Sequence, residues 1–110
     1  MSEFDNREHA YEAKFAHDQE LQFKARARRG ALMARWAAGE LGRTGPEAES
    51  YVQSLIPLAV GRDHEQALVK KLLADFQEAN HPMTEHRLRK QLAEFLELAT
   101  EQVNSEVRSS

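Results

Sequence analysis

Residues 41–47 read LGRTGPE, and this stretch separates one long helical segment from a shorter second one. Gly42 followed by a Gly-Pro pair is typical of a helix end, because glycine adopts the left-handed backbone there and proline cannot continue the helix. Thr44 and Glu47 have the spacing of a capping box, in which the two side chains satisfy free N–H groups of a new helix. We therefore predict that a first helix ends as this stretch begins and a second starts within it.

The segment before this stretch, from about Asp5 to Leu41, contains no proline and is predicted to be one long helix. Its weak points are Gly30 and Gly39. Gly30 is expected to bend the helix or to lower its stability by roughly 1 kcal/mol. A continuous helix would be about 55 Å long, whereas the second and third helices would not exceed roughly 27 Å. The N-terminal half is therefore expected to fold back, to protrude beyond the others or to be disordered alone. We favour a segment that is partly disordered when free and becomes helical on a partner.

Three further helical segments follow. The predicted starts are Thr44, Asp63 and Thr84 as N-caps, and the predicted ends are Pro57 to Gly61, Asn80-His81-Pro82 and a polar tail that frays from Ser105. Apolar residues recur at the helical period in the second (Ala48, Tyr51, Val52, Leu55, Ile56, Ala59), the third (Val69, Leu72, Leu73, Phe76) and the fourth (Leu88, Leu92, Phe95, Leu96, Ala99, Val103). The pattern predicts an all-α fold, an antiparallel four-helix bundle with an extended or disordered N-terminal arm. We divide the chain into an arm (residues 1–18), a bundle (19–107) and a disordered tail (108–110).

The first helix has two apolar faces. At about 100° per residue, one cluster points roughly 70° away from the other. The members are Phe4, Tyr11 and Phe15 in the first cluster, and Leu21, Ala25, Leu32 and Trp36 in the second. The change falls in the polar stretch His17–Glu20, which we predict to be a hinge. An aromatic stripe of this kind is more often core than interface, but the change of face and the excess length raise docking into a partner's groove to about equal weight.

Charge is distributed in three blocks. Residues 1–20 carry a net −4, residues 21–45 a net +5 and the remainder a net −4. Such blocks bear on the choice of partner more than on the fold. The chain has no cysteine, which excludes disulfides and thiolate metal sites. No apolar run approaches the roughly 20 residues that span a bilayer, and the acidic start does not resemble a signal peptide.

Other constellations give weaker signals. The basic residues Lys24, Arg26, Arg28 and Arg29 could contact nucleic acid or a nucleotide phosphate, but no aromatic platform or glycine-rich loop accompanies them. A solvated helix face is the simpler interpretation. The five histidines form no metal-ligand pair, and no catalytic motif occurs. We therefore predict no catalytic residue, no metal site and no nucleic-acid partner. We also predict no cofactor, apart from possible weak binding of ATP or ADP.

Residues 4–29, FDNREHAYEAKFAHDQELQFKARARR, closely resemble the start of the zeta-subunit family. These proteins inhibit the F-type ATP synthase of alphaproteobacteria. The match continues at Trp36-Ala37-Ala38 and Leu41-Gly42, and EHRLR at residues 85–89 resembles the start of the family's last helix. The resemblance is specific from Phe4 to Gly42 and looser between Gly45 and Pro82, where the segment around Pro57 departs from the family pattern.

The resemblance implies a four-helix bundle that inhibits ATP hydrolysis by the F1 sector. Its N-terminal segment would enter a catalytic interface between the alpha and beta subunits, beside gamma. The implied partner-binding positions are Phe4, Asp5, Arg7, Glu8, Ala10, Tyr11, Glu12, Lys14, Phe15, Ala16 and Asp18. The protein is then expected to be regulatory and not an enzyme, and to be monomeric when free. It would not insert into the membrane; it would be cytoplasmic and peripheral to the inner membrane through its binding to F1. The alternative is a nucleotide-sensing bundle with little or no inhibitory activity.

Overall fold

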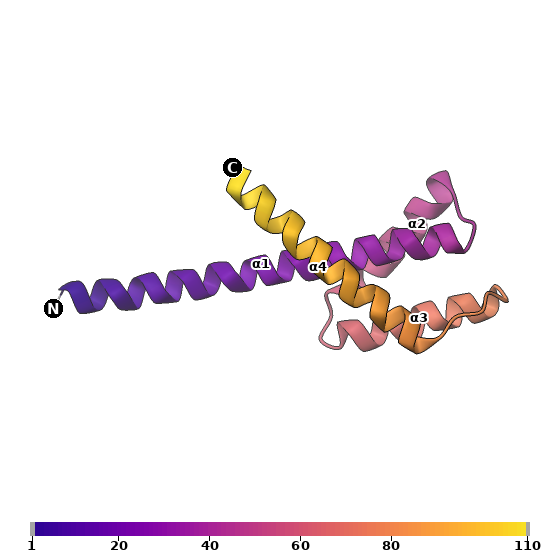
Figure 1. Cartoon of the computed structure of the whole chain (residues 1–110), viewed down its shortest axis with the longest axis horizontal. Coiled ribbons are helices and arrows are strands. Elements are labelled where there is room, and N and C mark those ends of the chain that lie inside the picture. Colours follow the sequence, from indigo (N-terminus) through magenta and orange to yellow (C-terminus); the bar gives the residue numbers. More distant parts are fainter. Residues whose placement is uncertain (1, 110) are drawn as a thin grey trace.

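The chain folds into four α-helices, seen in a computed structural model that describes the backbone of residues 2–109 and the side chains of residues 17–107. The helices are α1 (Ser2–Glu40), α2 (Gly45–Ala59), α3 (His64–Glu78) and α4 (Glu85–Ser109). Successive helices run in opposite directions, each packs on the next, and α4 returns to pack on α1 (Figure 1). The predicted all-α antiparallel four-helix bundle is confirmed.

Helix α1 is much longer than the bundle that it helps to form. Its N-terminal part extends past the other three helices (Figure 1), and the molecule measures 65 × 26 × 20 Å. The predicted extended arm is therefore present as a continuation of α1. The hinge predicted at His17–Glu20 is wrong, because the helix runs through these residues without a break. Their side chains are polar but none is a helix breaker, so the change of apolar face needs no kink.

The core is built from one face of each helix. Its large members on α2, α3 and α4 include Leu55, Phe76 and Leu92, and these confirm the predicted stripes of the three shorter helices. Helix α1 differs from prediction, because only Ala25 of its expected bundle face is buried, and Leu21, Leu32 and Trp36 are half-buried. Its other buried apolar residues are Met33, Ala34, Ala37 and Ala38. Small side chains on α1 let α2 and α4 pack closely against it.

The helix ends follow local chemistry. Gly42 has a φ of +77°, and the Arg43 N–H donates to the Ala38 carbonyl at 2.9 Å, so α1 ends in a Schellman motif. Asn80, with a φ of 55°, ends α3 in the same way. The Thr84 hydroxyl accepts from the Arg87 N–H at 3.1 Å, which confirms the predicted cap of α4.

Two predicted caps and the predicted tail need correction. Thr44 and Asp63 occupy the N-cap positions of α2 and α3, but neither side chain makes a capping hydrogen bond, so the capping box is not formed. Pro57 lies in the last turn of α2, as predicted. Helix α4 runs on to Ser109, so residues 105–107 are helical and not frayed. Of the disordered tail assigned to residues 108–110, residues 108 and 109 belong to α4 and only Ser110 lies outside the described backbone.

Helices α1 and α2 approach each other closely at Gly30. A Cβ built on Gly30 would overlap the Cβ of Ala59, in the last turn of α2. Gly30 is therefore required by packing, whereas the sequence pattern indicates only a weak point in a helix. Between residues 2 and 109, none of the helices combines the length and the apolar character needed to cross a bilayer.

Candidate functional site

Most of the predicted partner-binding positions occupy the first turns of α1, in the part that extends past the bundle (Figure 1). Their side chains lie outside the described residues, so their roles stay predictions. These positions are Phe4, Asp5, Arg7, Glu8, Ala10, Tyr11, Glu12, Lys14, Phe15 and Ala16. Asp18 is the one member with a described side chain; it is exposed and lies at the edge of a cleft between α1 and α4.

The four basic residues predicted as a phosphate contact do not form one patch. Lys24 is exposed and pairs with Glu20 at 3.5 Å, one turn earlier on α1. Arg28 turns toward the end of α4, whereas Arg26 and Arg29 line the cleft. Neighbouring helical residues point about 100° apart, which explains why a basic run in sequence separates in space.

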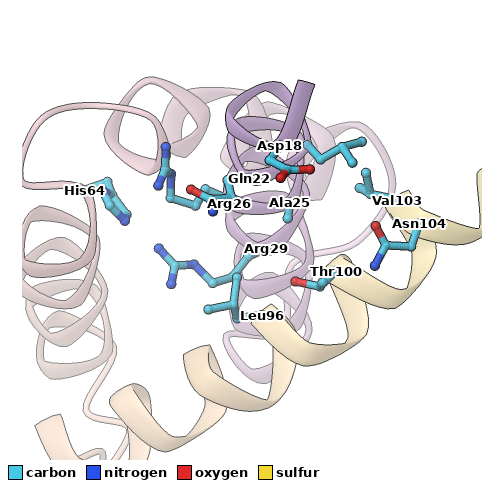
Figure 2. Close-up of a pocket in the computed structure, with 11 residues that line it drawn as sticks. Asp18, Gln22, Ala25, Arg26, Arg29, His64, Leu96, Thr100, Val103 and Asn104 are labelled. Carbon is cyan, nitrogen blue, oxygen red and sulfur yellow. The ribbon is translucent and has the colours of Figure 1, made fainter. Parts of the chain in front are cut away.

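The cleft encloses about 510 Å³ between α1, the start of α3 and α4 (Figure 2). Its walls combine apolar side chains with polar and charged ones. The lining residues are Asp18, Leu21, Gln22, Ala25, Arg26, Arg29, His64, Leu96, Thr100, Val103 and Asn104. A partly apolar cleft with a few convergent polar groups is typical of a small-molecule site.

Arg29 is the buried charge of this cleft. Its side chain is 5% exposed, and its Nε has no hydrogen-bond partner. Burial lowers the pKa of Arg29, which the negative charge of Glu65 opposes, and nearby Arg26 lowers this pKa further. A guanidinium stays protonated at neutral pH even so. Figure 2 shows Arg26, Arg29 and His64 around the same space, so an anion entering it would meet the positive charges of two arginines.

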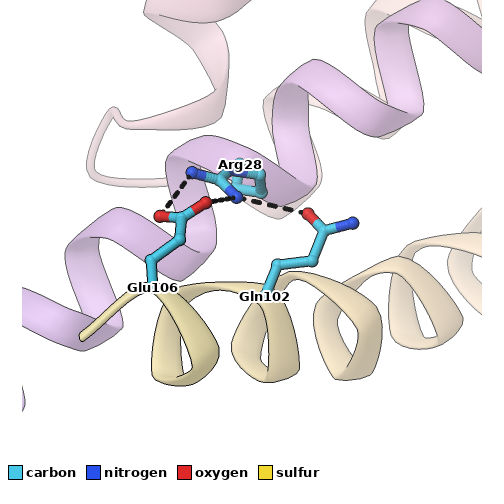
Figure 3. A network of polar contacts seen from close by, with 3 residues as sticks. All are labelled: Arg28, Gln102 and Glu106. Atoms are coloured by element: carbon cyan, nitrogen blue, oxygen red, sulfur yellow. Dashed lines mark hydrogen bonds and ion pairs between the residues drawn. The ribbon is translucent and has the colours of Figure 1, made fainter. Parts of the chain in front are cut away.

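Arg28 joins α1 to the last turns of α4 (Figure 3). Its guanidinium donates to both carboxylate oxygens of Glu106, with one N–O distance of 3.0 Å, and to Gln102 at 3.3 Å. The hydrogen bond with Glu106 raises the pKa of Arg28, and the same bond lowers the pKa of Glu106. This two-pronged pair ties α1 to the part of α4 in which the sequence predicts fraying, and because both side chains are partly exposed its contribution is small.

Two further polar side chains, Tyr51 and His81, make contacts between helices of the bundle. Tyr51 donates to Asp75 at 2.7 Å, and burial followed by this bond raises the pKa of Tyr51 well above its ordinary value. His81 packs on Phe76 and lies 3.4 Å from Glu40. Within the described part of the chain, no group of three or more histidine or acidic side chains is placed to hold a metal.

The burial of Arg29 is the feature that sequence reasoning missed. The basic run suggests a solvated face, and on that interpretation none of its arginines is expected to be buried. The signal that could have found it is register: Arg29 follows Ala25 by four residues and precedes Met33 by four, so all three share the face that the bundle buries.

Comparison with known families gives one result that agrees with this architecture. The family model of ATPase inhibitor subunit zeta matches residues 1–102, which include the extended half of α1, all but two of the residues that line the cleft, and most of α4. Among curated proteins, no match was found. Because the family model covers nearly the whole chain, the protein belongs to the ATPase inhibitor subunit zeta family.

Proposed function

We propose that this protein inhibits ATP hydrolysis by the F1 sector of an F-type ATP synthase, by inserting its N-terminal arm at a catalytic alpha/beta interface next to gamma. The observation that carries the proposal is the family match across residues 1–102, together with an α1 that extends past the bundle. An amphipathic helix that its own domain leaves uncovered is suited to bind in a groove of a partner.

The arm's sequence supplies both kinds of contact that such a groove needs. Phe4, Tyr11 and Phe15 would bury apolar area, and aromatic anchors carry much of the binding energy in interfaces of this kind. Arg7 and Lys14 would form ion pairs that fix the register of the helix. The protein would then be a regulatory one without catalysis of its own, monomeric when free and attached to the cytoplasmic side of the membrane through F1.

A hydrolysis assay tests the proposal directly. Purified full-length protein is added to the F1 sector from its own organism, and the rate of phosphate release from ATP is followed. We expect the rate to fall with added protein and to reach a plateau as the sites fill. Bovine serum albumin at equal concentration is the control. An unchanged hydrolysis rate, with no binding to F1 in a pull-down, would remove the proposal.

A second candidate function is nucleotide binding in the cleft, and buried Arg29 with its unpartnered Nε is the observation that favours it. The phosphates of ATP or ADP would provide the acceptor that Arg29 lacks, with Arg26 and His64 beside it (Figure 2). Asp18, at the edge of the cleft, is negatively charged and repels the phosphates, which limits the affinity for a nucleotide. This function is compatible with inhibition and could accompany it.

Replacing Arg29 by methionine tests whether the cleft binds the phosphates of a nucleotide. Losing one charge-assisted hydrogen bond costs about 1.5–3 kcal/mol, so we expect ATP affinity to fall by roughly 10- to 100-fold. Amide NMR shifts of residues around the cleft, recorded during ATP titration, give the affinity. Arg35→Met is the matched control, because Arg35 is exposed and pairs with Glu49 away from the cleft. Equal affinity in the wild type and both variants would rule out phosphate binding by Arg29.

A further inference from the structure

One face of α1 is covered by α2 along part of its length only. Gly30 meets Ala59 at the end of α2, so this contact identifies the face of α1 on which α2 packs. Phe23 and Ala27 precede Gly30 by seven and three residues, a spacing that keeps all three on one side of a helix. Because α2 runs antiparallel to α1 and ends at Ala59, the same face continues toward the arm without α2 over it.

The uncovered part of this face is apolar. Phe23 is 52% exposed, the largest fraction among the exposed large hydrophobic side chains of the described residues. Val60, which directly follows Ala59 at the end of α2, is 38% exposed, and Ala27 lies half-buried between Phe23 and Gly30. We call Phe23, Ala27 and Val60 the Phe23 surface. A half-exposed phenylalanine gives the free chain little of the stabilisation that full burial would give.

The Phe23 surface continues directly from the arm. Phe23 lies five residues after Asp18, about 7.5 Å along the same helix. Helix α1 is unbroken between the two, so the arm and the Phe23 surface keep a fixed relation to each other. Of the nearest charges, Glu20 and Lys24 pair with each other, whereas Arg26, three residues after Phe23, leaves a positive charge beside this surface. Phe23 points about 100° away from Phe4, Tyr11 and Phe15 around α1, so a partner that encloses the helix at the end of the arm meets this surface beside the anchor side.

We infer that the Phe23 surface is a second contact with the partner that takes the arm, packing on an apolar area at the entrance of the site that the arm enters. The inference rests on the proposed function and extends the partner-binding region beyond residues 1–18. Phe23 then acts as an anchor on the bundle, while the arm provides the deeper contacts. An anchor of this kind slows dissociation more than it changes association.

The test is Phe23→Ala in the full-length protein, with Leu98→Ala as the matched control. Leu98 is 41% exposed and lines a groove with Arg28, which is turned about 140° from Phe23 around α1. Both replacements remove an exposed apolar side chain, so both variants should melt like the wild type. We expect the concentration for half-inhibition of F1 hydrolysis to rise about five- to tenfold for Phe23→Ala and to stay unchanged for Leu98→Ala. Dissociation from immobilised F1 should quicken by the same factor.

Three results would overturn the inference, and they are distinguishable from failure of the proposed function. If the wild type inhibits and Phe23→Ala inhibits equally well, the Phe23 surface is no contact and the arm alone binds. If Phe23→Ala and Leu98→Ala weaken inhibition alike, the effect is not specific to this surface. If Phe23→Ala changes only the sedimentation of the free protein, the occupant is a second copy of the chain. If the wild type itself does not bind F1, the proposed function fails and this inference with it.

Discussion

A chain that lacks residues 1–18 is expected to lose inhibition of F1 while its bundle still unfolds cooperatively. Deletion removes the three aromatic anchors predicted at Phe4, Tyr11 and Phe15. Interface anchors of this type contribute about 2 kcal/mol or more each, so the combined loss should exceed 4 kcal/mol, a weakening of roughly a thousandfold or more. The hydrolysis assay measures the loss, and thermal unfolding followed by circular dichroism checks that residues 19–110 fold.

Two variants make this result specific. The triple replacement Phe4→Ala, Tyr11→Ala and Phe15→Ala keeps the length and helix propensity of the arm and should lose most of the inhibition. Deletion of residues 108–110, at the other end of the chain, should leave inhibition unchanged. Full inhibition by the truncated chain would contradict the role of the arm and direct attention to the bundle surface instead.

Gly30→Ala is expected to destabilise the protein, although alanine is the better helix former. The added methyl would overlap the Cβ of Ala59, and neither group can rotate away because both atoms are fixed to the backbone. Helices α1 and α2 must move apart, which costs about 1–3 kcal/mol. That cost outweighs the roughly 0.5–1 kcal/mol that alanine gains over glycine within a helix. Urea unfolding at neutral pH measures the difference.

The chain offers a matched control for this prediction. Gly39 also lies in α1 but has no neighbouring atom within 4 Å of a built Cβ, so Gly39→Ala should be neutral or stabilise by up to about 1 kcal/mol. The double variant Gly30→Ala with Ala59→Gly moves the methyl from one helix to the other and should recover part of the loss. If Gly30→Ala and Gly39→Ala stabilise equally, the close approach of α1 and α2 is wrong.

The parts of the fold that could be predicted from sequence depend on neighbours in the chain. Gly42 and Asn80 end helices because their backbones adopt positive φ, and the Thr84 cap reaches only three residues ahead. The stripes of α2, α3 and α4 were predictable because leucine and phenylalanine recur at a clear period. On α1 the buried residues are mostly alanines, such as Ala34 and Ala37, and alanine occurs equally on exposed helix faces, so its period carries little information.

The parts that could not be predicted depend on where distant segments meet. The need for Gly30 follows from which helix packs on which side of α1, and no local pattern reports that. The burial of Arg29 depends on the same packing, and only its four-residue spacing from Ala25 and Met33 hints at it. The end of α4 contacts Arg28, more than 70 residues earlier, and no pattern within residues 105–110 reports that contact. The length of the segment before Gly42 predicted the arm, whereas the exposure of Phe23 depends on where α2 ends beside Gly30.

The length of α1 beyond the bundle fixes a penetration depth. A single helix is about 10–12 Å across with its side chains, so a slot that accepts one helix excludes four packed together. From Ser2 to Asp18 the helix measures about 25 Å at 1.5 Å per residue. Entry into a narrow slot therefore stops when the bundle meets the rim, and the tip can reach no deeper than this distance. How far inside a partner the first residues act is thus decided by a count of residues in α1 and not by the strength of binding.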